Sequence, residues 1–340
     1  MAELNRTVRL AQRPTGLPDA ATWAIADEAM PEPGPGEILV RVDYLSLDPA
    51  MRGWINAGRS YIAPVEIGAV MRAGGIGEVL KSNTPAYAPG DLVHGMLGIQ
   101  KFAALRTDSS EPSQRMYKID TGLAPPQTWL GLLGLPGLTA YFGLLDVGAL
   151  KDGETVVVSA ASGGVGALVG QIARLKGCHV IGIAGGPEKC RFVVDELGFD
   201  ACIDYKADGL YKALQGALGE KRIDVYFDNV GGPILETCMT LLAMHARVVI
   251  CGAIVGYNDS SKIQGPRTYL NLLVSRARME GFVVFDYADR YAEAQAAIGG
   301  WLRSGKVKPL EDIRTCIDNF PGALNDLYSG GNFGKLILKP

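Results

Sequence analysis

The second part of the chain carries the pattern that most restricts its fold. Short apolar strands alternate there with helical segments, which is typical of a parallel sheet covered by helices on both faces. The predicted strands are Glu154–Ser159, His179–Ala184, Ala201–Asp204, Asp224–Asp228, Arg247–Cys251 and Glu280–Phe285. The predicted helices are roughly Gly164–Lys176, Glu188–Leu197, Leu210–Gly219, Ile234–Ala243 and Thr268–Ser275. This order predicts a complete doubly wound α/β sheet.

A glycine-rich turn follows the first of these strands. The segment Thr155–Gly166 (TVVVSAASGGVG) passes from a buried strand directly into a helix. Gly163 and Gly164 allow the backbone to approach a pyrophosphate, which the helix N-terminus attracts, and Gly166 lets the helix pack close to the strand. The spacing departs from strict Gly-x-Gly-x-x-Gly, so the surrounding strand and helix carry the prediction of a dinucleotide site. A tight packing turn without a ligand is the alternative.

The residues after the second predicted strand indicate which dinucleotide binds. Enzymes that use NAD place an Asp or Glu there, which hydrogen-bonds the ribose 2′-hydroxyl. Here Gly185 and Gly186 take that place, and Lys189 and Arg191 follow. Because a carboxylate repels a 2′-phosphate and a cation attracts it, this segment favours NADP(H). The alternative is that Lys189 is a solvated residue of the first helical turn.

The first part of the chain is β-rich. Short strands are predicted at Glu37–Tyr44, Gly75–Leu80 and Asp91–Gly95, separated by Gly and Pro. Strands of this length and spacing predict a small barrel or sandwich domain. The chain ends with a long amphipathic helix, Ala288–Ser304, and a strand, Gly334–Leu338, which we expect to return to the sheet of the first domain.

Charge and hydropathy exclude two classes of function. The formal net charge is −3, so the chain lacks the broad positive field that nucleic-acid binding needs. The most apolar segment, Leu130–Leu150, is interrupted by glycines, Pro136 and Asp146, whereas a membrane span needs about 20 mostly uninterrupted apolar residues. We expect a buried helix there, and the N-terminal sequence shows no signal peptide.

Histidine and cysteine are too scarce in the first domain for a zinc site. The chain has 3 His and 6 Cys, and its first half holds no Cys and only His94. Catalytic zinc needs Cys or His ligands, so no metal is expected. His94 is predicted to be a packed strand residue, His179 to open a strand and His245 to lie in a loop. The cysteines are expected to be buried, inert thiols of a reduced cytoplasmic protein, except Cys251, which ends a strand that faces the cofactor.

Five segments resemble a known family. They are LSLDPAMRG (45–53), GLPGLTAY (134–141), VSAASGGVG (158–166), DVYFDNVGG (224–232) and NFGK (332–335). They span nearly the whole chain in the order that is typical of the zinc-independent medium-chain dehydrogenase/reductase superfamily. The chain is most similar to the branch of prostaglandin, alkenal and curcumin reductases.

The resemblance implies a GroES-like catalytic domain made from both chain ends, 1–133 and 305–340, around an NADP-binding Rossmann domain, 134–304. It also implies a homodimer. Residues that it assigns to the cofactor are Thr139, Gly163, Gly164, Val165, Gly166, Lys189, Tyr205, Asn229, Cys251, Tyr257, Phe282, Val283, Val284 and Asn332. Phe282 to Val284 are at the same time expected to be part of a strand.

The implied reaction is the NADPH-dependent reduction of the carbon–carbon double bond of an α,β-unsaturated aldehyde or ketone. Tyr257 and Tyr61 are the candidate catalytic hydroxyl donors, and Tyr257 alternatively only positions the cofactor. Many members have Tyr where this chain has Ala50, which widens the substrate pocket or removes a donor. A quinone oxidoreductase of the same superfamily and a non-catalytic NADPH-binding protein are the alternative functions.

Overall fold

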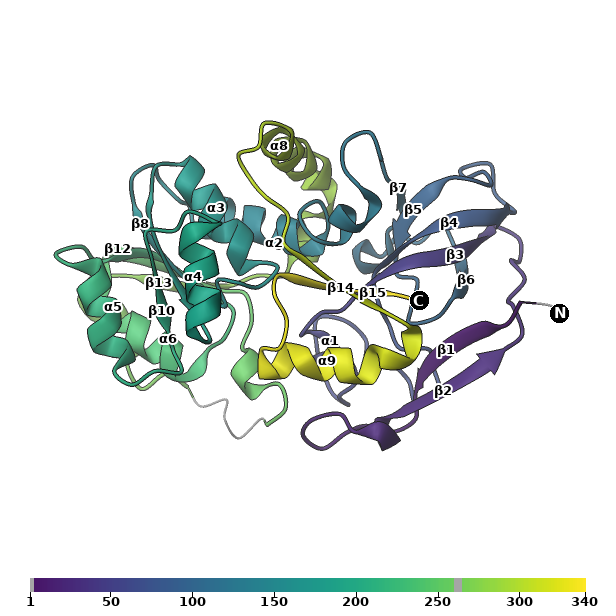
Figure 1. Ribbon diagram of the computed structural model, residues 1–340, viewed down its shortest axis with the longest axis horizontal. Coiled ribbons are helices and arrows are strands. Elements are labelled where there is room, and N and C mark those ends of the chain that lie inside the picture. The colour runs from purple at the N-terminus through teal and green to yellow at the C-terminus, as the bar shows by residue number, and fades with distance from the viewer. Residues whose placement is uncertain (1–2, 260–264) are drawn as a thin grey trace. The chain divides into compact units, whose positions relative to one another are not determined.

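The computed structural model describes residues 3–259 and 265–340 (Figure 1). The chain divides into two compact units. The first comprises the described residues up to Gly131 together with Glu311–Pro340, and the second comprises Leu132–Leu310. Each unit has its own sheets.

The second unit is built around a six-stranded parallel sheet. Its strand order is β10-β9-β8-β11-β12-β13. The strands are β8 (Thr155–Ser159), β9 (His179–Ala184), β10 (Ala201–Asp204), β11 (Ile223–Asp228), β12 (Leu242–Ile250) and β13 (Arg278–Gly281). The helices between them are α3 (Gly166–Leu175), α4 (Pro187–Asp195), α5 (Leu210–Leu218), α6 (Gly232–Met239) and α7 (Leu270–Ser275). The predicted doubly wound sheet is confirmed, and its direction of winding changes between β8 and β11.

Two predicted strands were wrong in their limits. β12 begins at Leu242, so His245 lies within a strand and not in a loop. His245 has a φ of 63°, and the pairing of β11 with β12 jumps from Ile223↔Leu242 to Val225↔Arg247. Together these features define a β-bulge around His245. β13 ends at Gly281, and Val284–Arg290 form a 3₁₀ helix (η7) in place of the predicted strand end.

The segment Leu130–Leu150 contains the expected buried helix, α2 (Leu135–Phe142), which continues into a π-helical turn, η4 (Gly143–Val147). Gly137 is required in α2 because a Cβ there would lie 1.7 Å from the Leu132 carbonyl oxygen. The long helix α8 (Tyr291–Arg303) also belongs to this unit. In the part of the chain that the structure describes, no helix is long and apolar enough to cross a membrane.

The first unit contains a seven-stranded sheet and a two-stranded one. The large sheet has the order β14-β15-β3-β4-β5-β7, with β6 also paired to β3, and β1 pairs with β2. The strands are β1 (Asn5–Leu10), β2 (Trp23–Glu28), β3 (Glu37–Ser46), β4 (Gly75–Ser82), β5 (Leu92–Gly95), β6 (Phe102–Arg106), β7 (Tyr117–Lys118), β14 (Glu311–Thr315) and β15 (Lys335–Lys339). The predicted return of the last strand is confirmed, since β15 pairs with β3. Sequence analysis missed β1, β2, β6, β7 and β14.

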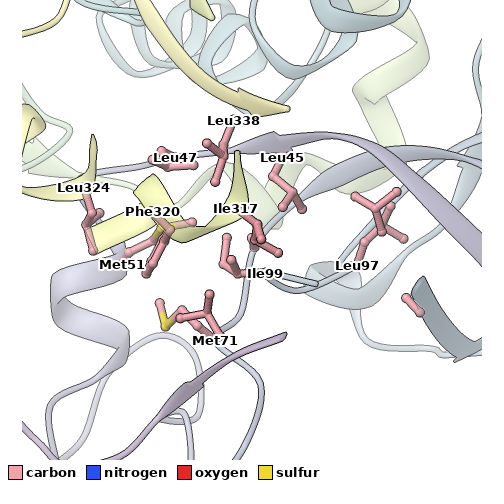
Figure 2. Packing of buried hydrophobic residues seen from close by; sticks show 14 of the residues in the cluster. Leu45, Leu47, Met51, Met71, Leu97, Ile99, Ile317, Phe320, Leu324 and Leu338 are labelled. Carbon is pink, nitrogen blue, oxygen red and sulfur yellow. The ribbon is translucent and has the colours of Figure 1, made fainter. Parts of the chain in front are cut away.

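Both ends of the chain share the core of the first unit (Figure 2). Leu45 of β3, Leu47 just after it and Met51 of the short helix α1 (Met51–Trp54) lie in one cluster with two residues of α9 (Phe320–Ser329), Phe320 and Leu324. Burial of each large apolar side chain contributes roughly 1.5–3 kcal/mol. The C-terminal segment is therefore an integral part of this unit.

The described 3₁₀ helices other than η7 are η1 (Ala20–Thr22), η2 (Pro112–Gln114), η3 (Pro126–Leu130), η5 (Ile254–Gly256) and η8 (Ile317–Asn319).

Candidate functional site

The glycine turn between β8 and α3 is closed so tightly that side chains do not fit in it. A Cβ on Gly166 would lie 2.3 Å from the Ala160 carbonyl oxygen, and one on Gly163 would lie 3.1 Å from the same atom. Ala160 has a φ of 51° and makes the sharp bend that the first glycine of the usual fingerprint provides. The half-buried backbone of Gly163, Gly164 and Val165 leads into α3, and the first amides of a helix have no intrahelical acceptor. This geometry fits a pyrophosphate.

A buried hydrogen-bond network joins the carboxyl ends of β8 and β11. Asp228 Oδ1 accepts hydrogen bonds from Ser159 Oγ (3.0 Å), Tyr226 Oη (2.8 Å), Val230 N (3.0 Å) and Gly231 N (3.0 Å). Asn229 donates its amide to Ser159 Oγ (2.9 Å) and its side-chain nitrogen to the Ser159 carbonyl (2.7 Å). Burial raises the pKa of Asp228. The network fixes Asn229, a predicted cofactor residue, at the point where the sheet changes winding direction.

Sequence reasoning missed Ser159 and Asp228. A signal was present, because each is the last residue of a predicted strand and the carboxyl ends of parallel strands meet at one edge of the sheet. Strand ends alone, however, do not show which polar residues face each other.

Cys251 and Tyr257 follow β12 and lie near this network. The Cys251 amide donates to the Asp228 carbonyl (2.9 Å). The Tyr257 hydroxyl lies over Gly252, since a Cβ on that glycine would be 3.0 Å from Tyr257 Oη and 3.4 Å from the Asn229 carbonyl oxygen. Burial, and next the charge of Asp228, raise the pKa of the Cys251 thiol to about 12. The thiol is therefore protonated near neutral pH and acts as a small apolar group, not as a nucleophile.

A second glycine turn lies between β9 and α4. Gly186 has a φ of 100°, and its amide donates to Asp204 Oδ1 (2.8 Å) at the end of β10. A Cβ on Gly185 would lie 3.0 Å from Tyr205 Cε1 and 3.1 Å from Lys206 Cε. The structure thus brings Tyr205 against the turn that precedes Lys189. Lys206 lies against the same turn. Sequence reasoning missed this residue, although its position directly after Tyr205 was a usable signal.

The other predicted cofactor residues of the second unit lie on α2 and after β13. Thr139 is half-buried on α2. Phe282, Val283 and Val284 follow the end of β13, so the expectation that they form part of a strand was wrong. The reason is packing: the Phe282 ring lies 6.4 Å from that of Phe227, edge to face, and occupies the space beside Gly143.

Three residues singled out from the sequence belong to the first unit. Tyr61 is 55% exposed, and its hydroxyl accepts a hydrogen bond from Trp54 Nε1 (3.1 Å). Asn332 donates from Nδ2 to the Gly334 carbonyl (2.9 Å). Ala50 immediately precedes α1 and packs against the core of this unit.

Comparison with known proteins identifies the family. A family model described as the N-terminal domain of oxidoreductase matches residues 6–112, and one described as zinc-binding dehydrogenase matches residues 164–298. A putative NADP-dependent oxidoreductase of Bacillus subtilis is 45% identical over an alignment of 342 positions that covers 100% of this chain and 98% of the relative. The NADPH-dependent curcumin reductase of Escherichia coli is 41% identical (98% and 96% covered), and a tobacco 2-alkenal reductase is 36% identical (98% and 97%).

The solved structures agree with these relatives. CurA from Vibrio vulnificus, crystallised with NADPH, has a TM-score of 0.91 and 42% identity, with 98% of each chain covered. A quinone oxidoreductase of Escherichia coli shares the fold alone, with a TM-score of 0.78 at 20% identity and 99% and 100% of the two chains covered. The chain belongs to the medium-chain dehydrogenase/reductase family, in its branch of NADP-dependent oxidoreductases. The curcumin and alkenal reductases to which it is similar belong to the same branch. The family predicted from the motifs is therefore confirmed.

The description of one of these family models names zinc. Among the described residues, no group of three or more His, Cys, Asp or Glu side chains is arranged to hold a metal ion. His94 is buried and stacks on Tyr117, with ring centroids 4.7 Å apart. Burial lowers the pKa of His94 to about 4, against a smaller opposing effect of Asp48. His94 is thus the packed strand residue that was predicted.

Proposed function

We propose that the protein reduces the carbon–carbon double bond of α,β-unsaturated aldehydes or ketones with NADPH and without zinc. The observation that carries this proposal is the convergence of the Gly163–Gly166 turn, Asn229 and the Tyr257 hydroxyl at the carboxyl ends of β8, β11 and β12. Ligands of doubly wound sheets bind at this edge, next to the point where the winding changes direction. Relatives named as curcumin and alkenal reductases support the choice of substrate class.

The residues around the two glycine turns fit the two charged parts of NADPH. The amides of Gly163 to Gly166 would hold the pyrophosphate at the N-terminus of α3. Lys189, Tyr205 and Lys206 would hold the 2′-phosphate beside Gly185. Residues of the second unit would line the remainder of the cofactor path: Thr139, Asn229, Cys251, Tyr257 and the backbone of Phe282 to Val284.

The chemistry divides between the cofactor and the chain. When bound, NADPH would supply the hydride for the β-carbon of the substrate. Negative charge then develops on the carbonyl oxygen, and the hydroxyl groups of Tyr257 and Tyr61 are the candidate donors that stabilise it before the α-carbon is protonated. Ala50 lacks the hydroxyl of the tyrosine that many family members have at this position.

A spectrophotometric screen tests the proposal. NADPH oxidation is followed with a panel of enals, enones and simple quinones, with NADH in parallel. We expect turnover of enals or enones, and product analysis should show a saturated carbon–carbon bond with the carbonyl retained. Activity with quinones alone would favour a quinone oxidoreductase. Tight NADPH binding without turnover of any compound would favour the non-catalytic alternative.

Substitution of Lys189 tests the choice of cofactor. A hydrogen bond to a charged group contributes about 1.5–3 kcal/mol, so Lys189→Ala should weaken NADPH binding roughly 10- to 100-fold and leave NADH binding nearly unchanged. Lys212→Ala, on the exposed side of α5, is the matched control. Equal weakening of NADPH and NADH would contradict the assignment of the 2′-phosphate.

We also propose that the protein is a homodimer that pairs through β13. This edge strand is exposed along its whole length, and nearby α7 presents Leu270, Leu273 and Val274 with 58%, 73% and 65% of their surface exposed. An unpaired strand edge beside apolar side chains favours pairing with another chain. Sedimentation analysis should show a dimer for the wild type and a monomer for Leu273→Glu. A wild-type monomer at micromolar concentration would refute the proposal.

A further inference from the structure

Two cysteines lie in contact beneath the turn that precedes Lys189. Cys190 is in the first half of α4 and Cys202 is in the middle of β10. Their sulfur atoms are 3.1 Å apart, with the Cys202 thiol donating to the Cys190 sulfur. Both are free thiols, and neither side chain is fully buried. A disulfide bond is about 2.05 Å long, so a relative movement of roughly 1 Å would join them.

The pair is connected directly to the proposed 2′-phosphate site. The Cys190 amide donates to the Gly186 carbonyl (3.2 Å), and the Gly186 amide donates to Asp204 Oδ1 (2.8 Å), two residues after Cys202. The Tyr205 amide donates to the Ala184 carbonyl (3.1 Å). A shift of α4 against β10 therefore displaces the glycine turn on which Tyr205 packs.

We propose that Cys190 and Cys202 are a redox modification site, and that closing it to a disulfide weakens NADPH binding. The second part rests on the proposed function, because it assumes that the 2′-phosphate binds beside Gly185. The first part rests only on the geometry of the two thiols.

Hydrogen peroxide is a sufficient oxidant for this step. The Cys190 sulfur, as thiolate, attacks one peroxide oxygen and breaks the O–O bond, which gives a sulfenic acid and, after proton transfer, one water. The Cys202 sulfur then attacks the sulfenic sulfur, the S–OH bond breaks, and the second water leaves with the thiol proton. Two thiols are oxidised to one disulfide, and one peroxide is reduced to two waters.

The surroundings of the thiols set the speed of this reaction. Burial raises the pKa of both groups, and the charge of Asp204 opposes either thiolate. Because thiolates react and thiols do not, the disulfide forms slowly. For the same reason it resists reduction once formed, since the reduced pair gains nothing from ionisation.

The first experiment maps the bond. The full-length protein is treated with hydrogen peroxide, quenched with catalase, alkylated and digested, and its peptides are analysed by mass spectrometry. We expect a peptide pair that links Cys190 to Cys202 and disappears after treatment with dithiothreitol. Free, separately alkylated Cys190 and Cys202 under conditions that oxidise the exposed Cys316 would overturn the proposal.

The second experiment measures binding. Titration of reduced and oxidised protein with NADPH and NADH should show at least a five-fold weaker affinity for NADPH after oxidation and a smaller change for NADH. Cys316→Ser should behave like the wild type, and Cys190→Ala should lose the oxidation effect. A mapped disulfide with unchanged NADPH affinity would overturn the coupling. A reduced protein that binds both cofactors equally would instead contradict the proposed 2′-phosphate site and leave the mapped disulfide standing.

Discussion

Gly166→Ala tests whether the turn between β8 and α3 is as tight as the structure shows. The added Cβ would lie 2.3 Å from the Ala160 carbonyl oxygen and 2.9 Å from the carbonyl carbon. Carbon atoms pack at about 3.5 Å or more, so one side has to move by roughly 1 Å. Both atoms are backbone, and a rotamer change does not relieve the contact. Overpacking of this kind costs about 1–3 kcal/mol, and the gain in helix propensity offsets at most about 1 kcal/mol of it.

Gly216→Ala is the matched control. Gly216 lies in α5 of the same unit, is exposed, and has no neighbouring atom within 4 Å of the place where a Cβ would be added. The same substitution there should stabilise the protein by about 0.5–1 kcal/mol, because alanine is the better helix former. Because the gain in helix propensity is common to both variants, they are expected to differ by the overpacking cost alone, roughly 1–3 kcal/mol in the free energy of unfolding, with Gly166→Ala the less stable variant.

Urea denaturation measures this difference, and an NADPH titration measures its consequence for binding. Displacement of the turn should weaken NADPH binding by at least about ten-fold, or 1.4 kcal/mol, in Gly166→Ala and leave it unchanged in Gly216→Ala. Wild-type stability and affinity in Gly166→Ala would refute the reasoning. A loss of stability with unchanged affinity would show that the turn is a packing feature without a cofactor, which is the alternative interpretation of the sequence.

Three further predictions concern single side chains. The pKa of His94 is about 4 in the folded protein and about 6.5 when unfolded. Between these values the unfolded chain binds one more proton than the folded protein, so up to about 3 kcal/mol of stability should be lost as the pH falls from 6.5 to 4. Urea denaturation at a series of pH values measures this loss. His94→Phe should flatten this part of the curve of unfolding free energy against pH. Lys335 is buried with its Nζ 2.6 Å from Asp48 Oδ1. Lys335→Met leaves the Asp48 carboxylate without this partner, so it should lower the free energy of unfolding by about 3–5 kcal/mol. Adding Asp48→Asn removes the uncompensated charge and should recover part of that loss in a double-mutant cycle. Tyr257→Phe should lower kcat for enones if the hydroxyl donates to the substrate oxygen, whereas a change confined to the KM for NADPH would assign it to cofactor positioning.

The doubly wound sheet was readable from the sequence because its signal is local. A continuous apolar run such as Thr155–Ser159 predicts a buried strand of a parallel sheet. Glycines or the start of a helix mark the limits of these runs. The β-rich unit was harder to predict. β1 (NRTVRL) and β14 (EDIRT) are rich in polar residues, and β7 has only two residues, so no apolar pattern of useful length marks these strands.

The same contrast holds for the candidate site. Gly163, Gly166 and Lys189 follow from motif and position, because the chain itself places them after a strand. Cys202 next to Cys190, and Lys206 next to Gly185, depend on how α4 lies against β10.

The sequence by itself determined the order of strands and helices in the second unit, the glycine turns and the family of this protein, because these are properties of short segments. The cytoplasmic location stays a prediction. Only the tertiary structure decided which groups from different strands meet, such as Ser159 with Asp228 and Lys335 with Asp48. The physical reason is that hydrogen bonds and buried charges act over a few ångströms in space, and distance along the chain does not measure that separation.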